Sequence, residues 1–330
     1  MKNMKSLLFK TVLMLLTLSW VLAVSAASVF AADDTYPSKP VRLVVPYAPG
    51  GSMDIVGRLI SPELSRLMGT QVVVDCRGGA GGVLGTEIVA KAEPDGYTLL
   101  LVNLGHAINP AFYKLPYDSM NSFTPIAKLL DGLHVLAVNQ SVPAKSVKEL
   151  IALAKQKPGQ LIAVAAGKGS SSHLGAELFK AMAGIDFKIV QFKGAGPAII
   201  DLVGGHSQFI ITSILPVLPH IKSGKLRVLG GGGLKRSVIL PDVPTLAESG
   251  LAGYDVSGWF GMVAPTGTPR PIVDRLSKEI KTLLSSAELQ KQFLSQGVEV
   301  GYLTPTEFVP FIEREIAKWE QVAKNANIKK

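Results

Sequence analysis

A β-branched run that leads into a glycine-rich turn and then into a helix constrains this sequence most. Residues 41–45 (VRLVV) predict a short buried strand, which Pro46 and Pro49 end because neither has a backbone N–H to donate. Residues 50–52 (GGS) form a turn whose backbone can approach a ligand, and helical apolar spacing starts after Asp54. The start of a helix offers free N–H groups and about half a positive charge, which suits an anion such as a carboxylate. The alternative is an ordinary turn in which Asp54 only caps the helix.

The next segments continue the alternation of strand and helix. Residues 71–75 (QVVVD) and 97–102 (YTLLLV) predict two more buried strands, and a helical stretch separates them. This βαβαβ order favours parallel strands, and ligands of such sheets bind beyond the carboxyl ends of the strands. The glycine cluster at 78–82 lies at such an end, but it lacks both the dinucleotide fingerprint and the Gly-Lys-Ser/Thr ending of a phosphate loop. Nucleotide binding is therefore disfavoured.

A second unit with the same arrangement begins near residue 133. Residues 161–165 (LIAVA) predict a strand, residues 167–173 (GKGSSSH) form a small polar loop, and a helix follows at 174–182. Three serine hydroxyls add side-chain donors to the backbone N–H groups of this loop. A serine-rich helix cap is the alternative. Two such loops in separate units nevertheless predict the two sides of one anion-binding site.

The C-terminal third returns the chain to the first unit. Residues 254–264 are extended and aromatic-rich, and they predict the return crossover. A short helix is expected at 246–249, and longer helices at 271–284, 287–295 and 305–323. The last two have capping-box spacing, Ser285 with Glu288 and Thr304 with Glu307. In the first helix, Pro62 is expected to cause a kink or to split off the last part.

The N-terminus predicts a cleaved secretory signal peptide at 1–31. Three lysines precede an apolar run at 13–24, and small residues follow it. The alternative is an uncleaved membrane anchor, but the apolar run is short for a membrane span. The predicted location is therefore the periplasm. The remaining chain is expected to divide into domain I (32–132 and 259–330) and domain II (133–258).

Composition limits the classes of function. The 330 residues, 47% hydrophobic and 18% charged, describe a folded chain of about two domains. The formal net charge is +9, but the lysines and arginines form no dense basic run, so no nucleic acid is expected as a partner. No histidine or cysteine pattern has metal-ligand spacing, and no serine stands in a nucleophile-elbow motif, so no metal, cofactor or catalytic residue is predicted. The single cysteine, Cys76, is interpreted as a small buried residue, with a reactive thiol as the alternative.

Several longer motifs carry a resemblance to a known family. They are YPxKPVRLVVPYAPGGSxD at 36–54, PDGYTLL at 94–100, GxGSxxHL at 167–174, LPDVPT at 240–245 and APxGTP at 264–269. With these motifs the chain resembles the extracytoplasmic solute receptors of tripartite tricarboxylate transporters, the Bug or TctC-like proteins. The resemblance covers nearly the whole chain after the leader.

The resemblance implies a fold, a function and partners. The implied fold is an α/β periplasmic-binding-protein fold of type II-like topology, with two lobes, two crossover strands and a ligand cleft between the lobes. The implied function is capture of a small organic acid, either a di- or tricarboxylate or an aromatic carboxylate, and its delivery to the membrane subunits of the transporter. A monomer without enzymatic activity is expected. The alternatives are a periplasmic sensor for a signalling partner and, less favoured, a secreted enzyme that acts on a small organic acid.

The residues and the resemblance together predict the ligand-binding set. Its members are the two opposed glycine- and serine-rich loops and their neighbours: Tyr47, Pro49, Gly50, Gly51, Ser52, Asp54, Ala80, Gly167, Gly169, Ser170, Ser171, Ser172 and His173. The chain departs from the family at 76–79, where Cys-Arg-Gly-Gly replaces the usual Asn-Arg-Pro-Gly. If Cys76 and Gly78 faced the cleft, they would leave room for a bulkier acid.

Overall fold

The computed structural model describes residues 36–325, so the predicted signal peptide at 1–31 lies outside the described residues. The sheets, helices and pocket described below all belong to one compact unit that begins at residue 39. Within the described part of the chain, no helix combines the length and the apolar character that a membrane crossing needs.

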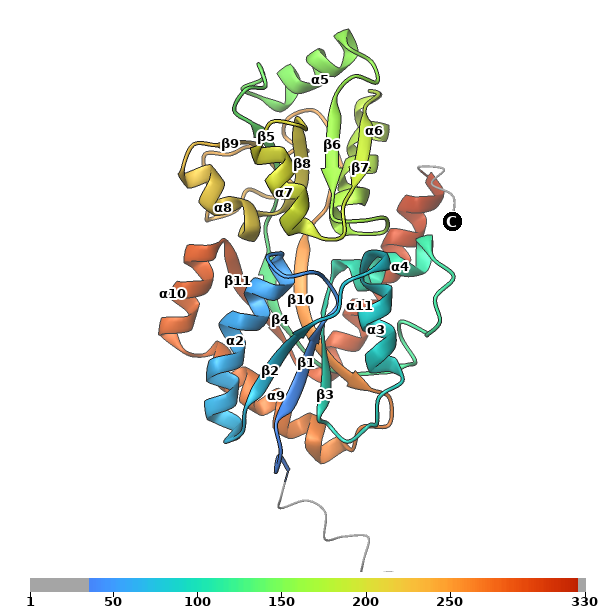
Figure 1. Ribbon diagram of the computed structural model, residues 1–330, viewed down its shortest axis with the longest axis vertical. Helices are drawn as coiled ribbons and strands as arrows, with labels where there is room; N and C mark the ends of the chain where they lie inside the picture. Colours follow the sequence, from blue (N-terminus) through green and yellow to red (C-terminus); the bar gives the residue numbers. More distant parts are fainter. Residues whose placement is uncertain (1–35, 326–330) are drawn as a thin grey trace, which may run out of the picture. The chain divides into compact units, whose positions relative to one another are not determined.

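The first sheet has six strands in the order β11-β4-β10-β3-β1-β2 (Figure 1). β1 lies between β2 and β3 and is parallel to both, whereas β10 is antiparallel to its neighbours β3 and β4. Every residue of β10 is buried, as its central position requires. The strand bounds are β1 Val41–Val45, β2 Val72–Cys76, β3 Thr98–Asn103, β4 Phe123–Gly132, β10 Gly258–Pro265 and β11 Val298–Leu303.

The second sheet has five strands in the order β7-β6-β8-β5-β9. β6 is parallel to β7 and β8, and β5 is antiparallel to β8 and β9. The bounds are β5 His134–Asn139, β6 Ile162–Ala165, β7 Lys188–Gln191, β8 Phe209–Ser213 and β9 Leu226–Gly231.

The chain crosses between the two sheets twice. It leaves the first sheet at the end of β4 and enters the second with β5, and it returns through residues 232–257 to β10. In each sheet the strand that follows a crossing is antiparallel to both of its neighbours, and β11 at the edge of the first sheet is also antiparallel to β4. The predicted α/β fold with two sheets and two crossover strands is confirmed, and the domain boundaries stay predictions.

Helices cover both sheets (Figure 1). The six-stranded sheet with its helices is called the first lobe, and the five-stranded sheet with its helices the second lobe. In the first lobe α2 packs on α9, and α11 packs on α4 and β4; in the second lobe α6 packs on β8, and α7 packs on α8. Glycines in the left-handed conformation end three helices: Gly69 after α2, Gly184 after α6 and Gly297 after α10. The bounds are α2 Ser52–Met68, η1 Ala80–Gly82, α3 Val83–Ala90, α4 Leu104–Phe112, α5 Val147–Gln156, α6 Ser171–Ala183, α7 Ala195–Val203, α8 Ile214–Lys222, α9 Arg270–Leu284, α10 Ala287–Gln296 and α11 Pro305–Asn325.

Aromatic side chains fill the space between the sheets and their helices. In the first lobe, Trp259 of β10 packs edge-on against Phe308 and Phe311 of α11, and its indole N–H donates to Glu315 at 3.0 Å. In the second lobe, Phe209 packs edge-on against Phe179 and Phe187, whose own rings are tilted by 39° to each other. These contacts tie α11 and α6 to their sheets.

Two local expectations are wrong, and a third is wrong in part. α2 is one continuous helix through Pro62, so the proline does not split off its last part, and the expected kink stays a prediction. Residues 246–249 form a turn rather than a helix. The N-cap of α10 is Ser286, whose hydroxyl accepts from Leu289 N, and not Ser285. The other capping box is confirmed, because Thr304 N donates to Glu307 at 2.9 Å.

Candidate functional site

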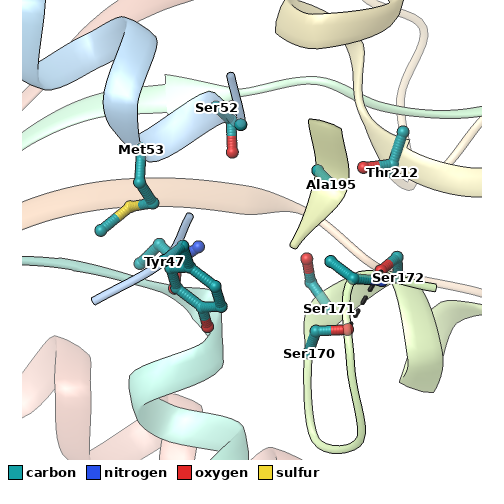
Figure 2. A pocket seen from close by; sticks show the side chains of 11 residues that line it. Tyr47, Ser52, Met53, Ser170, Ser171, Ser172, Ala195 and Thr212 are labelled. Carbon is teal, nitrogen blue, oxygen red and sulfur yellow. Dashed lines mark hydrogen bonds between the residues drawn. The ribbon is translucent and has the colours of Figure 1, made fainter. Parts of the chain in front are cut away.

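A pocket lies where the helix starts of both lobes meet (Figure 2). Its empty volume is ≈ 370 Å³, which includes the open mouth. A volume of this order is typical of sites for small molecules. The pocket is lined by Tyr47, Gly51, Ser52, Met53, Asn103, Ala166, Ser170, Ser171, Ser172, Ala195 and Thr212.

The first wall is the turn between β1 and α2. Gly50 has a φ of +81°, which favours glycine, and its N–H donates to the Asp54 carboxylate at 2.9 Å. The other oxygen of Asp54 accepts from Arg58 at 2.7 Å and from the Cys76 thiol at 3.3 Å. Burial by itself raises the pKa of Asp54, but the hydrogen bonds from Gly50, Cys76 and Arg58 outweigh it and lower the pKa. Asp54 therefore organises the turn as a carboxylate.

Tyr47 and Asn103 of the first lobe also line the pocket. The Tyr47 hydroxyl donates to the Gly81 carbonyl at 3.0 Å, and burial holds the pKa of this phenol far above its usual value. The Asn103 side-chain oxygen accepts from Gly105 N at the start of α4.

The second wall is the serine-rich start of α6. The Ser170 hydroxyl accepts from His173 N at 3.3 Å and donates to the Gly167 carbonyl at 2.7 Å, so Ser170 is a true N-cap. The Ser172 hydroxyl lies 3.0 Å from that of Ser170 and accepts from Ala166 N at 2.9 Å. In Figure 2 the hydroxyl of Ser171 lies on the side of the gap that faces Ser52. The hydrogen bonds fix the loop, and the first N–H groups of α6 remain available to a ligand.

A third helix start completes the second wall. Ala195 opens α7 and lines the pocket together with Thr212, which lies near the end of β8. Pocket residues thus come from the N-termini of α2, α6 and α7, and Asn103 is the N-cap of α4. No charged side chain is among them. Because each helix start carries about half a positive charge, the pocket is electropositive without a lysine or arginine.

The loops of the two lobes are in direct contact beside the pocket. The Tyr113 hydroxyl, after α4, donates to the Lys168 carbonyl of the second lobe at 2.6 Å. Glycines let the backbones approach closely here: a Cβ on Gly81 would lie 2.2 Å from that same carbonyl oxygen, and one on Gly194 would lie 2.9 Å from Ala48 Cβ. The structure is therefore a closed arrangement of the two lobes.

Six of the predicted residues line the pocket: Tyr47, Gly51, Ser52, Ser170, Ser171 and Ser172. Seven lie just outside it: Pro49, Gly50, Asp54, Ala80, Gly167, Gly169 and His173. Of these, Asp54 holds Gly50 N, and His173 Nδ1 accepts from Gly169 N at 3.3 Å. Whether any of the thirteen contacts a ligand stays a prediction.

Five lining residues have no counterpart in the sequence predictions. Ala195 opens a helix after a glycine turn, the same signal that singled out Gly51, so this pattern could have found it. Met53 and Ala166 are sequence neighbours of the two predicted loops, whereas Asn103 and Thr212 join them only through the sheet order and no local motif marks them.

Cys76 and Gly78 lie outside the pocket lining, which removes the expectation of extra room for a bulky acid. The Cys76 thiol donates to the Asp54 carboxylate. Burial raises the pKa of this thiol to about 11, and the hydrogen bond to Asp54 adds to the increase. A Cβ on Gly78 would lie 2.7 Å from Ala48 N, so the backbone fills that space. A high pKa makes Cys76 a poor nucleophile and disfavours the reactive thiol.

Over residues 36–325 no cluster of three or more histidine, cysteine, aspartate or glutamate side chains is placed to hold a metal ion.

Comparison with known proteins places the chain in a family. The family model described as "tripartite tricarboxylate transporter family receptor" matches residues 56–328. Protein BugT of Bordetella pertussis is 37% identical over 302 residues, 90% of this chain and 92% of BugT. An R. palustris protein solved with adipate matches with a TM-score of 0.86 and 35% identity, over 89% of this chain and 99% of that one. MatC from Rhodopseudomonas palustris with bound malate matches with a TM-score of 0.83 and 33% identity, over 87% and 99% of the two chains. This chain therefore belongs to the family of tripartite tricarboxylate transporter receptors.

Proposed function

We propose that this protein captures a small organic dicarboxylate in the periplasm and delivers it to the membrane subunits of a tripartite tricarboxylate transporter. The observation that carries the proposal is the pocket itself. Three helix N-termini converge on it, and no charged side chain lines it. An anion gains from all three dipoles, whereas a cation would meet no carboxylate among the lining residues.

The donor set supports a carboxylate in particular. Backbone N–H groups at Ser52, Ser171 and Ala195, together with the nearby hydroxyls, offer hydrogen bonds from two opposite walls. A ligand with two anionic ends can bind both walls at once. It would therefore stabilise the closed arrangement of the lobes.

The relatives favour dicarboxylates of modest length. The two similar solved proteins hold adipate and malate, both aliphatic dicarboxylates. We infer that aliphatic dicarboxylates are better candidates for this chain than aromatic acids.

The remaining parts of the proposal follow from family membership and from the leader sequence. A receptor of this family hands its solute to membrane subunits, and the predicted signal peptide provides the export that this role requires. We propose that the protein acts as a monomer and does not convert its ligand chemically.

Isothermal titration and thermal shift with malate, adipate and other carboxylates test the proposal. A ligand at about a hundred times its dissociation constant stabilises the fold by about 2.7 kcal/mol, which is a readable shift. The matched probe is the uncharged diamide of each acid, which keeps the size and removes the charge. We expect binding of at least one dicarboxylate and none of its diamide.

Two serine variants localise the binding. Ser52→Ala should weaken the interaction, whereas Ser295→Ala, at an exposed serine of α10, should not. Equal binding of acid and diamide would contradict the anion site. Formation of a product from any bound acid would show that the protein is an enzyme and not a receptor.

A further inference from the structure

His134 lies between the pocket and the two crossings that connect the lobes, which we call the hinge. It is the first residue of β5, immediately after the crossing from the first sheet, and it is 4% exposed. Its Nε2 lies 3.0 Å from the hydroxyl oxygen of Ser171 in the pocket lining. Its carbonyl oxygen accepts from Gly232 N at 2.8 Å, where the chain leaves β9 for the return crossing.

The other ring nitrogen of His134 has no hydrogen bond. Nδ1 is shielded from solvent and lacks a partner among the described residues. Gly258, on the return strand β10, leaves the room that the ring needs, because a Cβ there would lie 2.6 Å from both Nδ1 and Cε1. The imidazole is therefore packed against both crossings, with one nitrogen directed at Ser171 and the other sealed inside the hinge.

The sealed nitrogen determines the tautomer. A buried N–H without an acceptor is rarer and more costly than a buried acceptor without a donor. Nδ1 therefore carries the lone pair, and Nε2 carries the proton. Burial lowers the pKa of His134 to about 4, with Asp255 acting in the opposite direction, so the ring is neutral at neutral pH.

Two other buried histidines of the chain follow the same rule. His106 Nε2 lies 2.8 Å from the Ser119 carbonyl oxygen, which can only accept, and its buried Nδ1 also lacks a partner among residues 36–325. His173 Nδ1 accepts from Gly169 N, which leaves its Nε2 as the protonated nitrogen. His106 thus provides a matched internal reference for His134.

We propose that His134 is a positioning residue that donates through Nε2–H to Ser171 and so turns the Ser171 hydroxyl hydrogen into the pocket, toward an acceptor on the ligand. This inference rests on the proposed function, since a carboxylate is the acceptor that the pocket favours. A hydroxyl oxygen that already accepts from an N–H directs its own proton elsewhere, and the free direction at Ser171 is the pocket. The structure thereby holds a fixed donor on the second wall.

The tautomer can be measured without any ligand. In protein labelled with ¹⁵N at histidine, long-range ¹H–¹⁵N spectra at neutral pH distinguish a protonated from an unprotonated ring nitrogen. We expect His134 to show a protonated Nε2 and a bare Nδ1, as His106 does, with the signals assigned by their loss in His134→Gln. The opposite tautomer at His134 would overturn the proposal.

Ligand titrations test whether His134 affects ligand binding through Ser171. His134→Leu keeps a similar volume and removes the donor, and we expect dicarboxylate affinity to fall about two- to tenfold. His134→Gln keeps an amide N–H near the position of Nε2 and should recover part of the loss. The matched control is His106→Leu, which removes a buried imidazole and its Nε2 hydrogen bond to Ser119 outside the pocket lining and should leave affinity unchanged.

A double-mutant cycle distinguishes action through Ser171 from a general structural effect. Adding His134→Leu to Ser171→Ala should cost no further affinity, because the hydroxyl that His134 orients is already gone. Independent, additive losses would overturn the proposal. If the wild-type protein bound no carboxylate, the proposed function would fail, and the tautomer spectrum would still decide the inference about His134.

Discussion

Asp54 lies behind the turn of the first wall and holds that turn as a carboxylate. Its two oxygens accept from Gly50 N, Arg58 and Cys76, and it is only 6% exposed. A buried carboxylate is tolerated when its oxygens are hydrogen-bonded, and here the bonds come from the backbone of the pocket loop. The acid that the sequence motif marks is thus a support for the pocket and not part of its lining.

Asp54→Asn should therefore destabilise the protein and weaken ligand binding. An asparagine presents one NH₂ group in place of an acceptor, and it would face the N–H of Gly50 or the guanidinium of Arg58. We expect a loss of about 1–3 kcal/mol in urea unfolding followed by tryptophan fluorescence. Asp118→Asn, in an exposed turn, is the control and should cost less. Equal losses in the two variants would contradict the supporting role of Asp54.

The buried histidines make stability depend on pH. Burial lowers the pKa of His106, His134 and His173 to about 4, from an ordinary value of 6.5. Between these values the unfolded chain binds protons that the folded chain does not, so acid favours unfolding. The stabilisation is complete above about pH 6.5 and is lost as the pH falls toward 4, with on the order of 3 kcal/mol for each histidine.

Urea unfolding at pH 7 and pH 5 tests this dependence. We expect a clearly lower free energy of unfolding at pH 5, and a smaller difference between the two pH values in His106→Gln. The pKa values of Asp54 and Asp75 are lowered, so the titration of these two carboxylates affects stability below about pH 4 and not between pH 5 and pH 7. Equal stability at both pH values would show that these histidines are not held neutral by burial.

At the scale of elements, the helix starts create the site. Ser170 caps α6 at the pocket, and Ser286 caps α10 away from it, each by accepting from the N–H three residues on. Alanine at either position should cost about 1 kcal/mol of stability, because a cap is lost in each case. Ser170→Ala should cost more, since its hydroxyl also bonds Gly167 and Ser172.

The same pair of variants separates stability from binding. Only Ser170→Ala should weaken dicarboxylate binding in isothermal titration, because Ser286 is outside the pocket lining. A matching loss of affinity in Ser286→Ala would mean that general destabilisation, rather than the geometry of α6, controls binding.

The elements that sequence patterns predict are those with a strong local signal. β1, α2, β2 and β3 are found because β-branched runs, glycine turns and helical spacing follow one another closely. α4, β4 and β11 have no counterpart among the predictions. α4 is buried on almost every side and contains Pro110, β4 contains Pro125 and a buried Lys128, and β11 contains Gly301, so none shows a clear period.

The pocket was predictable only in part, for a related reason. The loops at Gly51 and Ser170 carry their own signal, since each joins a strand to a helix start. Asn103 and Thr212 lie at or near the ends of β3 and β8, and only the strand order brings them to the same place. Tertiary arrangement of this kind has no local pattern.

At the scale of the molecule, the closed arrangement of the lobes includes a direct hydrogen bond between them. Tyr113 donates to the Lys168 carbonyl across the gap, and Tyr113→Phe removes this one hydrogen bond with little change of shape. We expect dicarboxylate affinity to fall about two- to tenfold, because the closed state loses a contact that an open state does not make.

The control for this prediction is another tyrosine hydroxyl within a single lobe. Tyr302→Phe removes a contact with Ser277 in the first lobe and should leave affinity unchanged. Small-angle scattering adds an independent readout, since Tyr113→Phe should need more ligand than the wild type to reach the compact form. The same ligand dependence in both proteins would argue against closure through Tyr113.

A crystal structure of the protein grown with malate or adipate tests the anion site most directly. We expect a carboxylate in the pocket, with an oxygen within about 3 Å of the backbone N of Ser52 on one wall or Ser171 on the other. We also expect no lysine or arginine to contact that group. A carboxylate bound instead by surface lysine or arginine side chains, with the helix starts of α2, α6 and α7 untouched, would contradict the anion site.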